Sequence, residues 1–439
     1  MPATEPDISP AAVPSDDRRT FRLGVLNGVA FTFAESLIAA DLVLTNFVSK
    51  LTSSNFLIGL VVPLRDAGWF LPQLFVSSYL QYRDQMLPIY RRMAVIRSAA
   101  WVGMALAVLT LRNPGWLLLV FYVLYSIQSL ASGVSGLSFM DVVAKTVSSR
   151  RRGAFFAARM FFGGLLALAA SAMVEAALGG RIVPSYMGAI SLLTFVSWVF
   201  ASLGLLAFSS IREPRGEIRE EPSTLGQHVR RAARLPRDNR DFRWFLAGRA
   251  VLILGYMAAP FYGLYATREL GASDQIVGVF LAARTIAFLV SNPIWARVSS
   301  QRGNRLVMLI SAGLGAAFAL FAFVARPALE ASALPQAAWG YAFVPLFALW
   351  GAYESGTGVG GAPLLLDLAP PRDRAIYIGF TNSVLGVVLL STSLGGVMAD
   401  LLGFRGVFGF ALACYLIGVY VLWRMREPRT LGNGEPASG

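Results

Sequence analysis

Twelve apolar runs, each long enough to cross a lipid bilayer, constrain this chain more than any other feature of its sequence. A spanning helix needs roughly 17 to 25 predominantly apolar residues. Charged residues make up only 14% of the chain, whereas soluble domains carry about 25%. We therefore predict an all-α membrane protein with twelve transmembrane helices. The predicted spans are 21–47, 55–80, 93–111, 116–140, 154–178, 187–209, 242–267, 276–298, 306–325, 339–366, 376–402 and 407–423.

The basic residues predict how the chain is oriented. Of the 38 Lys and Arg residues, 27 lie in the N-terminal segment, in the connections that follow even-numbered spans and in the C-terminal tail. This number includes Arg22, Arg243 and Arg297, which stand at the ends of predicted spans; six more lie in the other connections and five deeper within spans. The positive-inside rule therefore places both termini in the cytoplasm and makes this a multi-pass protein of the plasma or inner membrane. Because the net charge of +13 orients the chain in its lipid bilayer, no nucleic-acid partner is expected.

A second feature is an internal repeat with an offset of about 220 residues. In each copy an arginine, an aromatic ring and an amide follow one another at four-residue intervals, which places all three on one helix face. These residues are Arg65, Trp69 and Gln73 in span 2, and Arg284, Phe288 and Asn292 in span 8. An arginine at mid-bilayer costs at least ~2.5 kcal/mol and usually faces a polar interior. The six side chains therefore predict a shared cavity that binds a substrate. The alternative is that each arginine is a structural pin that bonds carbonyls or a carboxylate.

The repeat also predicts the domain organisation. The segment TGVGG at 357–361 matches SGVSG at 132–136, and such parallel repeats place a binding site near mid-bilayer, where the halves meet. In the polar connection, Leu225, Val229, Ala232 and Leu235 recur at helical spacing opposite arginines, as in a helix that lies on an acidic lipid surface. We expect a disordered tail at 1–20, six-helix bundles at 21–210 and 242–426, a cytoplasmic linker at 211–241 and a tail at 427–439.

Three acidic residues are candidate proton carriers: Glu35 in span 1, Asp66 in span 2 and Glu354 among glycines in span 10. A carboxylate at mid-depth is costly, and protonation removes that cost. The competing interpretation is a structural ion pair between Glu35 and either Arg65 or Arg284. In a regular helix Asp41 lies about 120° around the axis from Glu35, and Asp66 points about 100° away from Arg65, so these neighbours need not face the same place.

Charged residues also cluster at the predicted cytoplasmic ends of the helices. They predict ion pairs that hold the helix ends together in one conformation and separate in another. The alternative, for Arg150 and Arg151 above all, is that the arginines only bind lipid phosphates. The predicted gate residues are Asp141, Arg152, Arg305, Asp367 and Arg374. Of the arginines within spans, Arg97 is expected at the membrane interface, and Arg159 is placed to reach the cavity.

The residues that usually hold metals or start covalent catalysis are scarce. The single cysteine, Cys414, excludes an intramolecular disulfide and a cysteine metal cluster, and the single histidine, His228, lies in the central connection. Neither a nucleophile nor a base stands at a recognisable catalytic spacing. We therefore expect no metal site, no cofactor and no enzymatic activity. Nothing in the sequence requires a partner chain, so a monomer is expected.

Two repeated six-helix halves, a long middle connection and cytoplasmic termini resemble the major facilitator superfamily of secondary transporters. Its signature loop reads roughly G-x-x-x-D-R-x-G-R-R between spans 2 and 3 and often recurs between spans 8 and 9. The first copy here retains Arg91 and Arg92. In the second copy only the later glycine and the final arginine are kept; the residues on the pattern are Ala296, Ser300, Gln301, Gly303, Asn304 and Arg305. The resemblance implies alternating access by rocking of the two halves.

Two motifs of one subfamily are missing from the sequence. Drug:proton antiporters of this superfamily carry an arginine inside span 4 and a Gly-Pro pair inside span 5. Here span 4 has no arginine, and span 5 has Gly163 and Gly164 without a proline.

Three functional hypotheses follow. The first is a secondary active transporter of a small organic solute, anionic or amphipathic, coupled to a proton or another ion. The second is an exporter of hydrophobic or cationic compounds or lipids, with the arginines held by Glu35, Asp66 and Glu354. The third, from another class, is a transport-dead membrane sensor or a polytopic enzyme, and the missing catalytic constellation argues against the enzyme.

Overall fold

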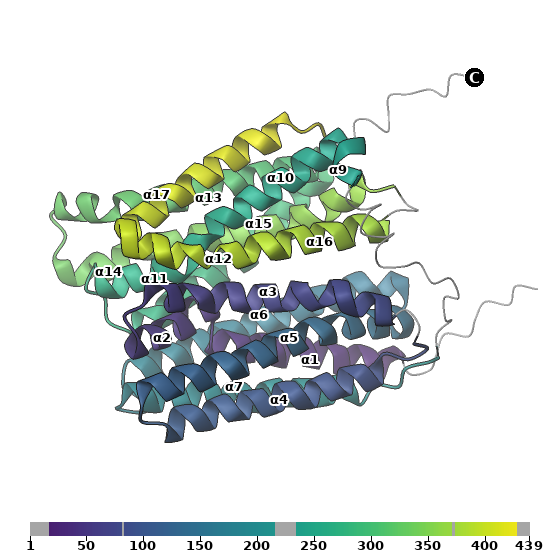
Figure 1. Ribbon diagram of the computed structural model, residues 1–439, viewed down its shortest axis with the longest axis horizontal. Helices are drawn as coiled ribbons and strands as arrows, with labels where there is room; N and C mark the ends of the chain where they lie inside the picture. The colour runs from purple at the N-terminus through teal and green to yellow at the C-terminus, as the bar shows by residue number, and fades with distance from the viewer. Residues whose placement is uncertain (1–16, 81–82, 216–233, 371–373, 428–439) are drawn as a thin grey trace, which may run out of the picture.

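The computed structural model describes residues 17–80, 83–215, 234–370 and 374–427, and the predicted all-α membrane fold is confirmed (Figure 1). Each of the twelve predicted spans overlaps a helix. Within the described part of the chain, nine segments are long and apolar enough to cross a membrane, and 376–391 is a shorter apolar helix. The helices of the first half are α1 Asp17–Leu37, η1 Ala40–Leu44, α2 Thr45–Leu51, α3 Asn55–Leu80, α4 Leu87–Thr110, α5 Pro114–Thr146, α6 Ser149–Leu178 and α7 Tyr186–Ser209.

The second half has the same order of long helices. The short helix α9 Leu235–Asp238 precedes them. The amphipathic linker helix that the sequence predicts ends at Leu235, and its other apolar residues, Leu225, Val229 and Ala232, lie outside the described residues. The helices are α10 Arg240–Gly255, η2 Tyr256–Ala258, α11 Ala259–Arg268, α12 Ile276–Arg302, α13 Asn304–Glu330, η3 Gln336–Ala338, α14 Trp339–Ala342, α15 Val344–Leu368, α16 Arg374–Ser391 and α17 Leu394–Arg424. The residue boundaries of the predicted bundles, linker and tails stay predictions.

The helices form two groups that lie side by side (Figure 1). In the first group α1 packs against α6 and α7, and α5 packs against α3 and α4. In the second group α15 packs against α12 and α13, and α17 packs against α10 and α13. The groups meet where α12 contacts α6 and where α16 and α17 contact α3. The interface between the halves therefore runs through the two helices that carry the repeated arginines, α3 and α12.

Spans 1 and 7 are interrupted at matching positions. In span 1 the helix α1 ends at Leu37, Ala39 has a non-helical ψ of 122°, and η1 is a π-helix. In span 7 the α-helix gives way to the 3₁₀-helix η2, and α11 follows with Pro260 in its first turn. Discontinuous helices near mid-bilayer are common in transporter folds with internal repeats. The break in span 1 changes the direction of every side chain beyond it, so the regular-helix geometry expected for Asp41 does not hold.

Span 11 is also interrupted, and its boundary with span 12 is a sharp turn. The helix α16 ends at Ser391, and α17 begins at Leu394 and bends at Gly403, whose φ is +68°. Only glycine adopts this left-handed conformation without a steric penalty. Gly403 therefore separates the two spans that were predicted to end at Leu402 and to begin at Val407.

The two halves are joined by polar contacts at the end of the molecule that lies away from α9. Asp274 accepts a hydrogen bond from Asn46 at 3.0 Å and forms an ion pair with Lys50 at 3.0 Å. Nearby, Arg268 donates to the carbonyl of Ser49 at 2.9 Å. Asn55 of α3 donates to Asp400 of α17 at 2.7 Å. These contacts close the halves against each other at this end.

Candidate functional site

Arg284 on α12 lies at the centre of a charged cluster in which the two halves meet. Its guanidinium donates to the carboxylate of Asp41 in η1 and lies 3.7 Å from that of Glu354 in α15. Its guanidinium carbon also lies 5.3 Å from the ring centroid of Trp350. The side chain of Asp41 is only 3% exposed. The cross-half ion pair between Arg284 and Asp41 is therefore buried, and Asp41 is a central residue that sequence analysis did not select.

Arg65 on α3 pairs with its own neighbour in the chain. Its Nε lies 2.7 Å from Oδ1 of Asp66, although the two side chains leave the helix about 100° apart. The long arginine side chain folds back around the helix to reach the carboxylate. The pair is much more open than that of Arg284, since 39% of the Arg65 side chain is exposed. Ser129 on α5 donates to the carbonyls of Leu64 and Arg65 and thereby fixes α3 against α5.

Glu35 on α1 has an exposed side chain without a hydrogen bond or an ion pair to another described residue. The charges of Arg65, Arg97 and Asp66 act on its carboxylate. Phe31, one turn earlier on the same face of α1, lies 4.5 Å from the guanidinium carbon of Arg97 on α4, so this face of α1 is turned toward the interior of the first half. Of the three predicted proton carriers, Glu35 is the one without a fixed arginine partner.

Arg97 on α4 was expected at the membrane interface, and this prediction was wrong. The residue is 4% exposed, and its guanidinium donates to Oγ of Ser135 on α5 at 3.0 Å. The guanidinium carbon lies 4.5 Å from the ring centroid of Phe31. The partner, Ser135, belongs to the serine-rich segment of span 4, and that segment was the sequence signal for a buried hydrogen-bond acceptor. Arg97 therefore belongs to the interior of the first half.

The aromatic and amide residues of the repeat occupy different environments. Trp69 is 40% exposed, and its ring lies against Gly136 of α5. Phe288 and Asn292 on α12 are half-buried. The side chain of Gln73 lies outside the described part of the structure. Substrate binding by these residues stays a prediction.

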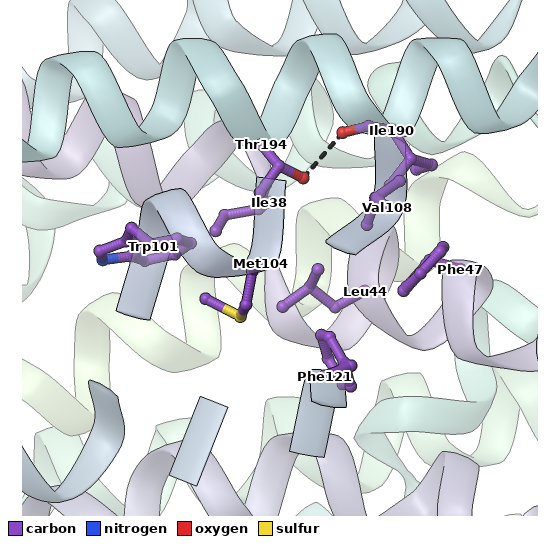
Figure 2. A pocket seen from close by; sticks show the side chains of 9 residues that line it. All are labelled: Ile38, Leu44, Phe47, Trp101, Met104, Val108, Phe121, Ile190 and Thr194. Atoms are coloured by element: carbon purple, nitrogen blue, oxygen red, sulfur yellow. Dashed lines mark hydrogen bonds between the residues drawn. The ribbon is translucent and has the colours of Figure 1, made fainter. Parts of the chain in front are cut away.

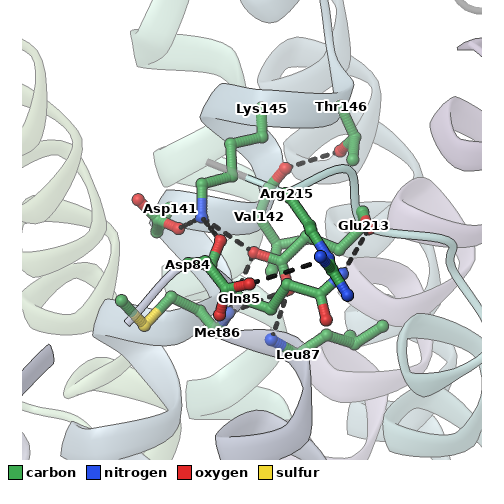
Figure 3. A network of polar contacts seen from close by, with 10 residues as sticks. All are labelled: Asp84, Gln85, Met86, Leu87, Asp141, Val142, Lys145, Thr146, Glu213 and Arg215. Carbon is green, nitrogen blue, oxygen red and sulfur yellow. Dashed lines mark hydrogen bonds and ion pairs between the residues drawn. The ribbon is translucent and has the colours of Figure 1, made fainter. Parts of the chain in front are cut away.

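The predicted gate residue Asp141 belongs to a network within the first half (Figure 3). It pairs with Lys145 at 2.6 Å, and Lys145 also pairs with Glu213 at 3.0 Å. Glu213 accepts hydrogen bonds from the backbone N–H groups of Met86 and Leu87. A carboxylate at this place caps the N-terminus of α4 and stabilises the helix dipole.

The other predicted gate residues with described side chains also bond within their own half. Arg152 donates to the carbonyls of Ala144 and Val147, at 2.6 and 3.1 Å. Asp367 accepts from Nδ2 of Asn304 at 2.7 Å. Arg305 donates to the last carbonyls of α17, those of residues 422 and 423. The side chain of Arg374 lies outside the described residues. A gating role for these residues stays a prediction.

Glu213 has a counterpart in the second half that sequence analysis missed. Glu427 accepts from the backbone N–H of Arg305 at 3.2 Å and lies at the start of α13, as Glu213 lies at the start of α4. The signal was present in the sequence, where REPR at 212–215 recurs at 426–429. The repeat therefore extends to the acids that cap spans 3 and 9.

A small apolar cavity within the first half is separate from this charged centre (Figure 2). Its volume is about 10 Å³, which is room for about one water molecule. The hydroxyl of Thr194 donates to the carbonyl of Ile190, so it offers the cavity no free donor. A solute of organic size does not fit there. The lining residues are Ile38, Leu44, Phe47, Trp101, Met104, Val108, Phe121, Ile190 and Thr194.

Sequence comparison finds relatives for parts of the chain. Residues 244–439 match the family model described as Major Facilitator Superfamily. The chain is 28% identical over 184 residues to "Multidrug resistance protein MdtG" of Dickeya zeae (strain Ech586). This match covers 39% of the chain and spans 41% of the length of the relative.

Solved structures match almost the whole chain. A D-xylose-proton symporter aligns with a TM-score of 0.70 at 15% identity and covers 94% of this chain and 98% of its own. An auto-inhibited POT family peptide transporter aligns with a TM-score of 0.69 at 14% identity, with 96% and 99% covered. The nucleoside transporter NupG aligns with a TM-score of 0.63 at 13% identity, with 93% and 98% covered. These identities establish the fold alone. The second half of this multi-pass membrane protein thus matches the model of the Major Facilitator Superfamily, and the whole chain has the fold of these solved transporters.

Proposed function

We propose that this protein is a proton-coupled secondary transporter whose central site takes the neutral or cationic part of an amphipathic organic solute. The charge balance of the centre carries this proposal. Three guanidiniums, those of Arg65, Arg97 and Arg284, lie among four carboxylates. Because Arg65 and Arg284 already pair with carboxylates, they have little free charge to offer an anion. The four carboxylates are those of Glu35, Asp41, Asp66 and Glu354.

Glu35 is the proposed proton carrier. An ionised carboxylate within a membrane-spanning helix is costly unless a cation or a proton neutralises it. Since Glu35 has no ion-pair partner among the described residues, a proton and the cationic group of a solute can compete for it. Such competition couples the movement of one to the movement of the other in the opposite direction. Asp66 and Glu354 already have arginine partners, so they are less suited to this exchange.

Alternating access is the proposed mechanism, and Trp69 and Phe288 are the proposed apolar contacts of the solute. The interruptions of spans 1 and 7 lie at the centre, where Asp41 binds Arg284 across the halves. If the positive-inside rule holds, the end bearing α9 faces the cytoplasm of a bacterial inner membrane. The end closed by Asp274 then faces outward. The name of the relative, a multidrug resistance protein, is consistent with export of amphipathic compounds.

Transport in proteoliposomes tests this proposal. We expect the wild-type protein to move ethidium, an aromatic cation, faster when a pH gradient of opposite direction is imposed. Glu35→Gln should still equilibrate ethidium but should lose the acceleration by the gradient, because the amide cannot carry the proton. Glu354→Gln is the matched control, since it removes a central carboxylate that already has an arginine partner.

Two results would contradict the proposal. If Glu35→Gln kept its response to the gradient while Glu354→Gln lost it, the proton would travel on Glu354. If a panel of organic acids, amines and neutral aromatic compounds gave transport of the acids alone, the proposed substrate class would be wrong.

A further inference from the structure

Arg249 on α10 differs from the four other arginines deep within the spans, because it forms no hydrogen bond and no ion pair with another described residue. It is half-buried, and its Nη1 lies 3.1 Å from the position that a β-carbon on Gly361 of α15 would occupy. By contrast, Arg159 on α6 donates to the carbonyl of Gly24 and to the side-chain oxygen of Asn27. Arg249 therefore brings an uncompensated positive charge into the interior of the second half.

One face of α15 connects Arg249 with the central cluster. Glu354, Gly358 and Gly361 recur at intervals of four and three residues, so they lie along one side of this helix. Glu354 lies by Arg284 at one end of this side, and Gly361 lies under Arg249 at the other. At Gly358, between them, a β-carbon would meet no atom within 4 Å. This face of α15 is therefore open at Gly358, between the carboxylate and the guanidinium.

Tyr353, the residue before Glu354 on α15, lies within reach of the charges of both Arg249 and the centre. The charges of both Arg249 and Glu354 act on the hydroxyl of Tyr353, which also forms a hydrogen bond with Tyr415. Arg249 thus lies next to Gly361, two helical turns along α15 from Glu354 and within the same half. Among the described residues, neither the acid Glu35 nor the base Arg249 has an ion-pair partner.

We propose that Arg249 forms a second, anion-binding subsite, which takes the carboxylate or phosphate end of an amphipathic solute whose remainder extends along Gly358 toward the centre. This inference rests on the proposed function and extends its substrate class to compounds with an acidic group. An unpaired guanidinium suits this role, because its planar fork binds a carboxylate or phosphate through two parallel hydrogen bonds. The anion in turn supplies the missing counter-charge.

Ligand-dependent thermal stability of the purified full-length protein in maltoside detergent tests the subsite. The probes are 4-phenylbutyrate, 4-phenylbutanamide and 4-phenylbutylamine, which differ only in their end group. A bound ligand stabilises the folded protein by mass action, so the shift at each concentration gives an apparent affinity. We expect Arg249→Gln to weaken the affinity for phenylbutyrate by about tenfold or more, and to leave that for phenylbutylamine within about twofold. Arg243→Gln is the matched control, since Arg243 is an exposed arginine on the same helix.

A second variant keeps the proposal testable if Arg249→Gln fails to fold. Gly358→Leu places a side chain in the open space and should also weaken phenylbutyrate binding while Arg249 stays intact. Phenylbutyrate affinities that are unchanged in both variants would overturn the subsite, as would a wild-type protein that binds the amine and not the acid. Wild-type binding of the acid alone, lost in Arg249→Gln, would support the subsite and contradict the cation-binding centre. Suppression of the phenylbutyrate shift by phosphatidylglycerol would assign Arg249 to a lipid headgroup and overturn its role in solute binding.

Discussion

Arg65 and Arg284 stand at the same register of the internal repeat, yet they form different kinds of ion pair. Arg65 pairs with Asp66, its neighbour in the chain, and the pair is partly open. Arg284 reaches Asp41 in the other half of the molecule, and that pair is buried. One pair is confined to a single helix, whereas the other joins the two halves that alternating access would have to move.

The difference shows what an internal repeat preserves and what it leaves free. The repeat preserves the position of each arginine on its helix, because helix geometry depends on local sequence. It leaves the partner free, because the partner depends on where the neighbouring span is interrupted. In span 1 the π-helix η1 turns Asp41 toward α12. In span 7 the corresponding interruption brings Tyr256 near the centre, and its hydroxyl interacts with the charges of Arg65 and Arg284.

Removal of Arg284 should have the largest effect on stability. Arg284→Gln leaves the Asp41 carboxylate buried without its cation, and loss of one partner of a buried pair costs about 3 to 5 kcal/mol. Reversible unfolding in mixed maltoside–SDS micelles measures the change in the free energy of unfolding. A loss below about 1 kcal/mol would mean that the Asp41–Arg284 pair is hydrated, which contradicts its burial.

A double-mutant cycle sharpens this result by measuring the pair itself. Asp41→Asn in the Arg284→Gln background removes the unpaired charge, so the double variant should recover about 1 to 3 kcal/mol relative to the single arginine variant. The measurement is the same unfolding free energy for all four corners of the cycle. Strictly additive single effects would show that Asp41 and Arg284 do not interact energetically.

The sequence predicted the fold well because its signals are local. Length and hydrophobicity of each run predict a spanning helix, and the repeat predicts that two groups of helices face each other. The candidate centre was predicted only in part. Arg65, Arg284, Glu35 and Glu354 were selected because charges within apolar runs are conspicuous. The pairing of Asp41 was missed because it depends on an interruption of span 1, and no proline or glycine at Ala39 marks that interruption.

The glycine segments of spans 4 and 10 give the next comparison, since Gly133 and Gly358 occupy the same place in the repeat. A β-carbon at Gly133 would lie 2.5 Å from the backbone oxygen of Trp69, which cannot move aside as a flexible side chain can. Gly133→Ala should therefore cost about 1 to 3 kcal/mol through overpacking. Gly358 meets open space, so Gly358→Ala should gain up to about 1 kcal/mol from its higher helix propensity. Unfolding free energies with the same sign for both variants would contradict this asymmetry between the halves.

The smallest effect is expected at Arg65, whose ion pair is the more exposed of the two. Arg65→Gln should lower the free energy of unfolding by at most about 1 kcal/mol, because its side chain is 39% exposed and water can hydrate the remaining carboxylate of Asp66. The effect should shrink further at 1 M salt, where the Debye length falls to about 3 Å. A loss of unfolding free energy equal to that of Arg284→Gln and independent of salt would mean that the carboxylate of Asp66 is as inaccessible to water as that of Asp41. The two arginines would then be equivalent, and the repeat would have preserved their environment as well as their register.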